Sequence, residues 1–247
     1  MIFAYARLRE FLHHLRSHYP VLPLGQWQGE RAAILRHDVD FDLESAARLA
    51  ELEQDCGLSS TFFVLCDSAF YNPAARASRE RLRRILEAGC EVGLHFDPPE
   101  SDLEAHARRQ ADWLGNLVGR EIRSLSLHNP HRLTGEYPLV PGFLNAYDPR
   151  IFQPDRYLSD SCLRFRHDPF EFVARPREGP LQILLHPVHY SEEGGGYAHR
   201  FSSLLGRFLQ ELDGNVRPYN ATYAAEIQPE LLTWFRAGAP SPRTHSS

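Results

Sequence analysis

The stretch from Ile34 to Asp42, ILRHDVDFD, is where an apolar run ends in a histidine and several acids. The apolar run is typical of a buried strand, and a helix-like segment follows the acids at once. Asp42 is suited to cap that helix. His37, Asp38 and Asp40 are residue types that bind metals or transfer protons. The stretch therefore predicts a strand–helix unit whose polar residues lie at the carboxyl end of the strand, where parallel α/β folds place their sites.

The same alternation of strand and helix continues along the chain. Apolar, β-branched runs predict strands at 32–35, 60–65, 90–94, 122–127, 157–158 and 181–185, with one more near 143–147. Helical periodicity predicts helices over 3–18, 42–54, 78–88, 101–118 and 199–212. The helix predicted over 101–118 begins with Ser101-Asp-Leu-Glu104, which matches a capping box. Apolar strands that alternate with helices indicate an α/β fold with a parallel sheet, as a barrel or as an open doubly wound sheet.

Composition places the chain among ordinary globular proteins. It has 247 residues, of which 43% are hydrophobic and 24% charged, enough for one sizeable core. We expect a single catalytic domain over residues 1–236, including the N-terminal helix. The Pro- and Ser-containing tail at 237–247 is predicted to be disordered. The formal net charge of −5 argues against a nucleic-acid partner, because such proteins carry basic patches.

Cysteine usage and the N-terminal sequence bear on location. The four cysteines are scattered and form no CxxC motif, as expected for reduced thiols. The N-terminal segment carries arginines within its apolar pattern and has no uninterrupted apolar region of the kind found in signal peptides. No run approaches the length of a membrane-spanning helix. These features predict a cytoplasmic protein without a membrane span.

Metal-binding and acid–base side chains recur at the ends of the predicted strands. Five of the predicted strands are followed by such residues. They are His37, Asp38 and Asp40 after 32–35, His95 and Asp97 after 90–94, His128 and His131 after 122–127, Asp160 after 157–158, and His186 and His189 after 181–185. Loop composition alone would place such residues at one or two ends. The sequence contains no HExxH, GxSxG, P-loop or GxGxxG motif. The pattern therefore predicts one shared site built from several strand ends.

Several of these stretches together resemble the polysaccharide deacetylase superfamily, in its His-Asp-Val-Asp branch. The resemblance runs from Ile34 to Tyr190 through RHDVDFDLESAARLAELE, STFFVL, GCEVGLHFD, SLSLHNPH, YLSDSCLRFR and LQILLHPVHY. It implies a distorted (β/α)7 barrel, a divalent metal that is most often Zn²⁺, and hydrolysis of an N-acetyl group on a sugar.

The resemblance also implies a metal-ligand set. The paired acids of the first motif correspond to Asp38 and Asp40, of which we take Asp40 as the metal ligand and Asp38 as the general base, although the reverse remains open. His95 corresponds to a metal histidine of the second motif. The second histidine expected four residues later is replaced by Pro99. His128 is the expected replacement ligand, with Asp97 and His131 as alternatives.

The remaining roles come from the last motifs. LLHP implies that His186 is the catalytic acid, and YLSDS implies that Asp160 orients it. Arg132 and Arg164 are candidates for orienting the base. This set is chemically sufficient, because a metal-bound water, a carboxylate base and an imidazolium acid together hydrolyse an amide.

Two other functions remain open at this point. The same residues could hydrolyse another amide or an ester, since an activated water attacks any carbonyl. The replacement at Pro99 also fits a catalytically decayed carbohydrate-binding homologue. We expect the partner to be a carbohydrate or sugar-precursor substrate, and the oligomeric state stays open.

Overall fold

The structure is a computed structural model that describes residues 3–99, 101–130, 136–228, 230 and 233. The chain separates into two compact units, one from Met1 to Tyr197 and one that begins at Ala198. The predicted disordered tail at 237–247 lies outside the described residues. Among the described helices, none combines the length and apolar character that crossing a membrane requires.

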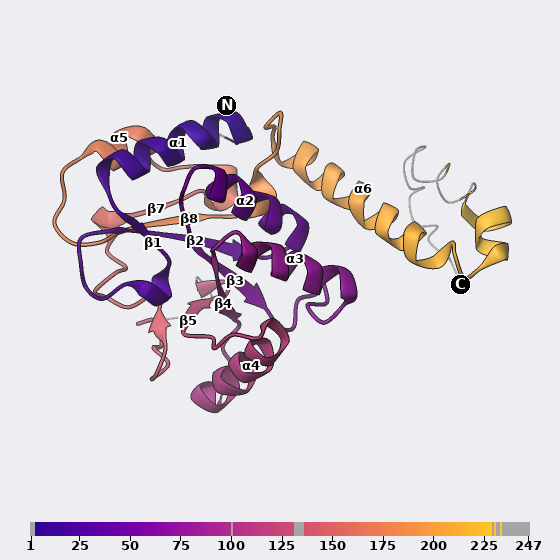
Figure 1. Ribbon diagram of the computed structural model, residues 1–247, viewed down its shortest axis with the longest axis horizontal. Coiled ribbons are helices and arrows are strands. Elements are labelled where there is room, and N and C mark those ends of the chain that lie inside the picture. The colour runs from indigo at the N-terminus through magenta and orange to yellow at the C-terminus, as the bar shows by residue number, and fades with distance from the viewer. Residues whose placement is uncertain (1–2, 100, 131–135, 229, 231–232, 234–247) are drawn as a thin grey trace, which may run out of the picture. The chain divides into compact units, whose positions relative to one another are not determined.

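The first unit is built on one parallel sheet (Figure 1). Its strands follow the order β6-β5-β4-β3-β2-β8-β7, and β1 pairs with β2 outside this path. The strands are β1 (Val21–Leu22), β2 (Ala33–Val39), β3 (Thr61–Leu65), β4 (Glu91–Phe96), β5 (Ser124–Leu127), β6 (Leu144–Asn145), β7 (Tyr157–Ser159) and β8 (Leu181–Leu185). Every residue of β2, β3, β5 and β8 is buried, as expected for strands covered on both faces.

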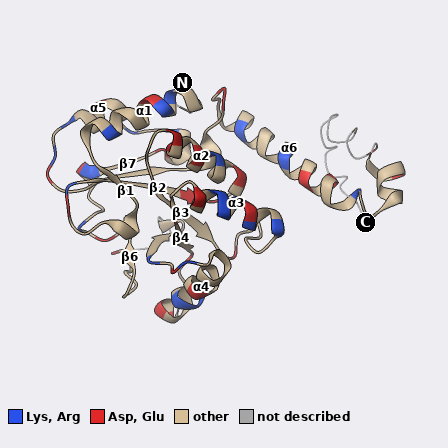
Figure 2. Cartoon of the chain, viewed as in Figure 1, with Lys and Arg blue, Asp and Glu red and all other residues tan. Residues whose placement is uncertain are grey.

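A row of helices covers the outer face of the sheet. In the first unit the helices are α1 (Tyr5–His18), α2 (Leu43–Asp55), α3 (Arg76–Glu87), α4 (Leu103–Val118) and α5 (Pro169–Ala174). They pack side by side in the order α5-α1-α2-α3-α4. Figure 2 shows acidic and basic residues interspersed on α3 and α4. The chain continues into α6 (Tyr197–Val216) and a π-helical turn at Tyr223–Ile227.

Buried side chains show that the sheet curls into an incomplete barrel. Gln182 on β8 donates a hydrogen bond of 2.8 Å to the carbonyl of Ala146, which follows β6. Arg36 on β2 reaches the Tyr147 hydroxyl at 3.0 Å. These contacts join strands that are far apart in the sheet order, so the β6 end must bend back toward β2 and β8. The sheet order places β6 and β7 at its two ends without a pairing between them in the described residues. The expected parallel α/β fold, a distorted barrel, is confirmed.

The elements that were predicted lie close to observed ones, whereas β1 and α5 were not predicted and one helix start is wrong. Asp42 caps α2 by accepting the Ser45 N–H at 2.8 Å, as predicted. The predicted capping box at Ser101 is wrong. The backbone enters the left-handed region at Asp102 (φ 53°), and α4 begins at Leu103, one residue too late for Ser101 to be its N-cap. Glu104 instead bonds Arg108 along the helix.

Candidate metal centre and active site

The parallel register brings the polar strand ends to one edge of the sheet. His95 on β4 lies opposite Ser126 on β5, and Asp38 on β2 lies opposite Phe63 on β3. On the other side of β2, His37 pairs with Leu185, the last residue of β8. Residues that follow these strands therefore emerge side by side, although they are far apart in the sequence.

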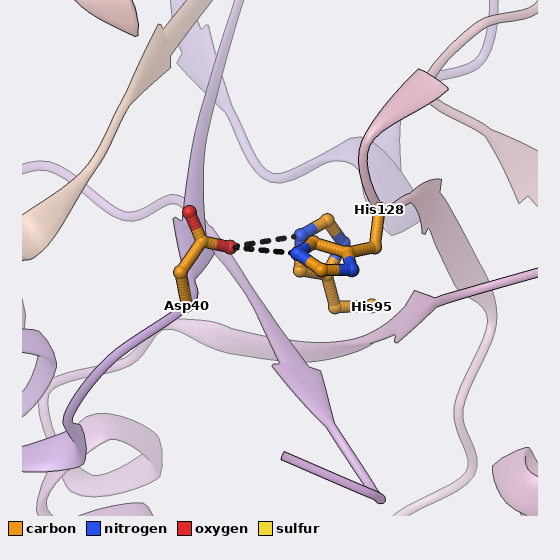
Figure 3. A group of neighbouring side chains, drawn as sticks. All are labelled: Asp40, His95 and His128. Atoms are coloured by element: carbon orange, nitrogen blue, oxygen red, sulfur yellow. Dashed lines mark hydrogen bonds and ion pairs between the residues drawn. The ribbon is translucent and has the colours of Figure 1, made fainter. Parts of the chain in front are cut away.

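Asp40, His95 and His128 form a cluster at this edge (Figure 3). One ligand atom from each lies within 4.8 Å of the others. His95 Nε2 is 3.2 Å from Asp40 Oδ1, and His128 Nε2 is 3.9 Å from the same oxygen. Ligands held at about 2.0–2.2 Å around one zinc ion lie roughly 3.3 Å apart. Small side-chain movements therefore suffice for these atoms to share an ion.

The orientation of His95 suits a metal ligand. Its Nδ1–H donates a 3.0 Å hydrogen bond to the Ser126 carbonyl, which can only accept, and its Nε2 lies 3.2 Å from Asp40 Oδ1. In the protonated ring Nε2–H donates to that carboxylate, and in the neutral ring the lone pair on Nε2 would be available to an ion. Metal-binding histidines characteristically use their second nitrogen in this way. His128 lies edge-to-face against His95, with ring centroids 5.0 Å apart.

The electrostatics of the cluster also favour a cation. Burial disfavours the imidazolium form of His95, but the carboxylates of Asp38 and Asp40 raise the pKa of His95 above its ordinary value. Burial and the charge of His95 lower the pKa of His128. Burial opposes the charged form of Asp40, yet its hydrogen bond with His95 brings the pKa of Asp40 below its usual range. The negative charges of Asp38 and Asp40 favour a proton on His95. A divalent cation bound at the same place would neutralise those charges.

The donor set therefore fits a divalent transition metal. One carboxylate and two imidazoles match the preference of zinc and its neighbours for nitrogen and oxygen ligands, and a three-residue set leaves positions for water and substrate.

Asp38 has different surroundings from Asp40. It is buried, with 5% of its surface exposed, and Arg36 lies 3.4 Å from its Oδ2. The Ser126 hydroxyl is 3.4 Å from Oδ1, and His95 Nε2 is 3.9 Å from Oδ2. Burial opposes the charge of Arg36, but Asp38 and Tyr147 raise its pKa, so the guanidinium stays protonated. Asp38 thus lies beside the metal cluster as a carboxylate held by a buried cation.

A histidine–aspartate pair lies on the other side of Asp40. His186 Nδ1 is 2.6 Å from Asp160 Oδ1, and the His186 backbone N–H is 3.1 Å from both carboxylate oxygens. His186 Nε2 lies 3.9 Å from Asp40 Oδ2. Burial disfavours the imidazolium, but the Asp160 carboxylate raises the pKa of His186 to about 9. His189 Nδ1 lies 3.1 Å from the second oxygen of Asp160.

His37 faces the opposite side of β2. Its Nε2 bonds the Glu53 carboxylate of α2 at 2.6 Å, and its ring stacks on Phe62. The second oxygen of Glu53 accepts the Ser60 hydroxyl at 2.5 Å. Because neighbouring strand residues alternate between faces, His37 ties the sheet to α2, while Asp38 faces the site.

The structure thus brings together the six predicted site residues, namely Asp38, Asp40, His95, His128, Asp160 and His186. Of the alternatives, Asp97 lies 3.7 Å from His128 Nδ1 with half of its side chain exposed. His131 and Arg132 lie outside the described residues, and Arg164 is exposed.

The sequence did not indicate Arg36 or Ser126 as neighbours of these residues, whereas His189 was among the strand-end residues expected at the shared site. Strand alternation signals Arg36, since it lies two residues before Asp38 and must share its face. Asp160 reaches His189 only because the chain turns through Pro187–His189 directly after His186.

Comparisons with known proteins give distant structural neighbours. No family model matches the chain, and no curated protein matches it. A CE4 family pseudoenzyme from Bacillus anthracis is similar over 74% of this chain, with 14% identity and a TM-score of 0.43. The chain spans 62% of that protein's length, less than two thirds. A mutant CE4 family pseudoenzyme with restored enzymatic activity is 12% identical over 74% of this chain and 64% of its own, with a TM-score of 0.42.

A third similar structure is a family 4 acetyl xylan esterase from Clostridium thermocellum in complex with a cobalt ion. It is 17% identical, with a TM-score of 0.39, over 63% of this chain and 73% of that one. These three solved structures are all described as CE4 or family 4 proteins.

Proposed function

We propose that this chain is a metal-dependent hydrolase that removes an N-acetyl group from a sugar or polysaccharide precursor, with Zn²⁺ as the ion. The observation that carries the proposal is the arrangement around Asp40. A three-residue metal cluster lies between a buried carboxylate, Asp38, and an imidazole, His186, that is held by its own aspartate. A metal-binding group, a general base and a general acid are the elements that metal-assisted hydrolysis of an unactivated amide uses.

Each element has a role in the proposed reaction. Asp40, His95 and His128 would hold the ion, and a bound ion would supply Lewis-acid chemistry for the acyl carbonyl and the attacking water. Asp38 accepts the proton of the attacking water, and Arg36 keeps that carboxylate in place. His186 approaches from the Asp160 side and donates a proton to the departing nitrogen. Asp160 holds the His186 ring in its orientation and favours its protonated form.

Acetate release tests the proposal. The full chain is loaded with Zn²⁺ or Co²⁺ and incubated with N-acetylated sugars and, separately, with O-acetylated sugars. We expect metal-dependent release from the N-acetyl substrates that is lost in Asp38→Asn and His186→Ala. If acetate is released only from the O-acetylated sugars, the chain is an esterase and not an amidase.

A decayed carbohydrate-binding homologue is the second candidate. Pro99 stands where the family resemblance predicts a second metal histidine, and the ligand set is complete only with His128. This candidate predicts carbohydrate binding without acetate release under any metal. Measuring carbohydrate binding and acetate release on one preparation separates the hydrolase from the decayed homologue.

A further inference from the structure

His189 is buried beside the His186–Asp160 pair, and the proposed reaction does not yet use it. Only 4% of its surface is exposed, and its Nδ1 lies 3.1 Å from Asp160 Oδ2, an ion-pair contact. The other carboxylate oxygen, Oδ1, lies 2.6 Å from Nδ1 of His186. Burial opposes ionisation of Asp160, but the two imidazoles hold its pKa well below the usual range. One buried, ionised carboxylate therefore faces two imidazoles, one at each oxygen.

The short distance to His186 distinguishes this group from the cluster around Asp40. Ligand atoms that share one zinc ion lie roughly 3.3 Å apart, because each is about 2.0–2.2 Å from the ion. The 2.6 Å between His186 Nδ1 and Asp160 Oδ1 is shorter and is typical of a charge-assisted hydrogen bond. An ionised carboxylate can only accept, so the proton of this bond is on His186 Nδ1. The group is thus built to hold an imidazole in place.

The turn that carries His189 is fastened at both ends. The His189 N–H donates to the His186 carbonyl at 3.0 Å, directly after β8. Two residues further on, Ser191 accepts the Tyr5 N–H at 2.7 Å and donates to the Phe3 carbonyl at 3.2 Å. The Phe3 ring also lies edge-to-face against the His189 ring, with centroids 6.0 Å apart. The N-terminal segment therefore helps to keep His189 against Asp160.

The orientation of the Asp160 carboxylate matters because it fixes the His186 ring. Nδ1 of His186 is bonded to Asp160, while Nε2 lies 3.9 Å from Asp40 Oδ2, at the metal cluster. The His186 backbone N–H is 3.1 Å from both carboxylate oxygens, so it does not favour one rotation of the carboxylate over another. His189 contacts only Oδ2 in the described contacts, and this leaves Oδ1 to His186.

We propose that His189 is a positioning residue for the catalytic acid: its Nδ1 contact with the far oxygen of Asp160 holds that carboxylate so that the near oxygen orients His186. This proposal rests on the proposed function and extends it by one residue. His189 does not touch the substrate and acts through Asp160.

Two variants separate the nitrogen of His189 from its ring. His189→Phe keeps an aromatic ring beside Phe3 but has no nitrogen, whereas the side-chain amide of His189→Asn can donate from near the place of Nδ1. The zinc-loaded full chain is assayed on N-acetylated sugars. We expect His189→Phe to lower kcat about tenfold with KM and zinc content unchanged, and His189→Asn to lower it about twofold or less. The reverse order, with His189→Phe active and His189→Asn impaired, would assign His189 to packing and overturn the proposal.

A double-mutant cycle tests whether the effect passes through Asp160. In the Asp160→Ala background, His189→Phe should not lower kcat further, because the contact is already lost. Glu53→Ala is the control for general destabilisation, since it removes the buried partner of His37 on the other face of β2. It should leave kcat unchanged. The proposal is overturned by an equal fractional loss from His189→Phe in both backgrounds, or by an equal loss in Glu53→Ala.

An NMR measurement makes the result independent of activity. Two-bond ¹H–¹⁵N spectra of the zinc-loaded chain observe Nδ1 of His186 through ring protons that do not exchange with water. We expect this Nδ1 signal to shift in His189→Phe and to stay close to its natural position in His189→Asn. That result without acetate release from the natural sequence supports the positioning of His186 and contradicts the hydrolase. An unshifted signal in His189→Phe overturns the positioning role, whether or not acetate is released.

Discussion

The two carboxylates on either side of Val39 differ in what surrounds them. Asp38 is buried against Arg36, whereas Asp40 faces His95 and His128. We therefore expect Asp40→Asn to lose bound metal, and Asp38→Asn to retain it while kcat falls about 10²–10⁴-fold, the usual effect of removing a general base. Metal analysis and kinetics on the two variants check this. Metal loss in Asp38→Asn with retention in Asp40→Asn would reverse the two roles.

The His186–Asp160 pair predicts a pH dependence. A pKa of about 9 keeps His186 protonated at neutral pH, and the proton is lost as the pH rises through that value. In Asp160→Asn the largest influence that raises the pKa of His186 is gone, and only the carboxylates of Asp40 and Asp38 still oppose burial, so that pKa should fall toward its ordinary range. NMR titration of the metal-free protein measures both values. If His186 still titrates near 9 in Asp160→Asn, another group sets its pKa.

The site residues could be predicted because each occupies a strand end and belongs to a residue type with metal or proton chemistry. Their partners could not be predicted in the same way. Ser126 contributes a backbone carbonyl to His95 and a hydroxyl to Asp38, and both contacts depend on the register of β5 and the curl of the sheet. No local pattern encodes a contact between residues so distant in the sequence.

Among the secondary-structure elements, a buried hydrogen bond joins β2, the strand that carries Asp38, to α2, the helix that covers it. Glu53 on α2 binds both His37 and Ser60, and all three side chains are buried. Glu53→Ala leaves those groups without their acceptor, so we expect a loss of about 1–3 kcal/mol in the free energy of unfolding. Glu51→Ala is the control, because Glu51 is on the same helix but half-exposed, paired with Arg84. Its loss should be about 1 kcal/mol or less in urea denaturation. Equal losses in the two variants contradict the role of Glu53.

Long periodic elements were predictable, whereas two of the short elements were not. The apolar run 181–185 coincides with β8. By contrast, α5 has only six residues and β1 only two, and both were missed. In α5 the Asp168 cap and the following proline are local signals. Its stability also depends on packing against α1, where Phe170 contacts Phe11 and His14. Such tertiary contacts outweigh the weak pattern of a short segment.

At the scale of the whole molecule, every predicted site residue lies in the unit that ends at Tyr197. We therefore expect a chain truncated after residue 197 to bind the same amount of metal as the full chain, provided that it remains folded by circular dichroism. Metal analysis after gel filtration makes the comparison. A folded truncated chain without metal would show that residues beyond 197 contribute to the metal centre.

The central claim is that Asp40, His95 and His128 bind one ion. A crystal structure of the Zn²⁺-loaded protein, with anomalous scattering measured on both sides of the zinc edge, tests it directly. We expect one strong anomalous peak per chain, within about 2.0–2.2 Å of all three side chains. A peak at Asp160, His186 and His189 instead, or no peak at this edge of the sheet, would contradict it.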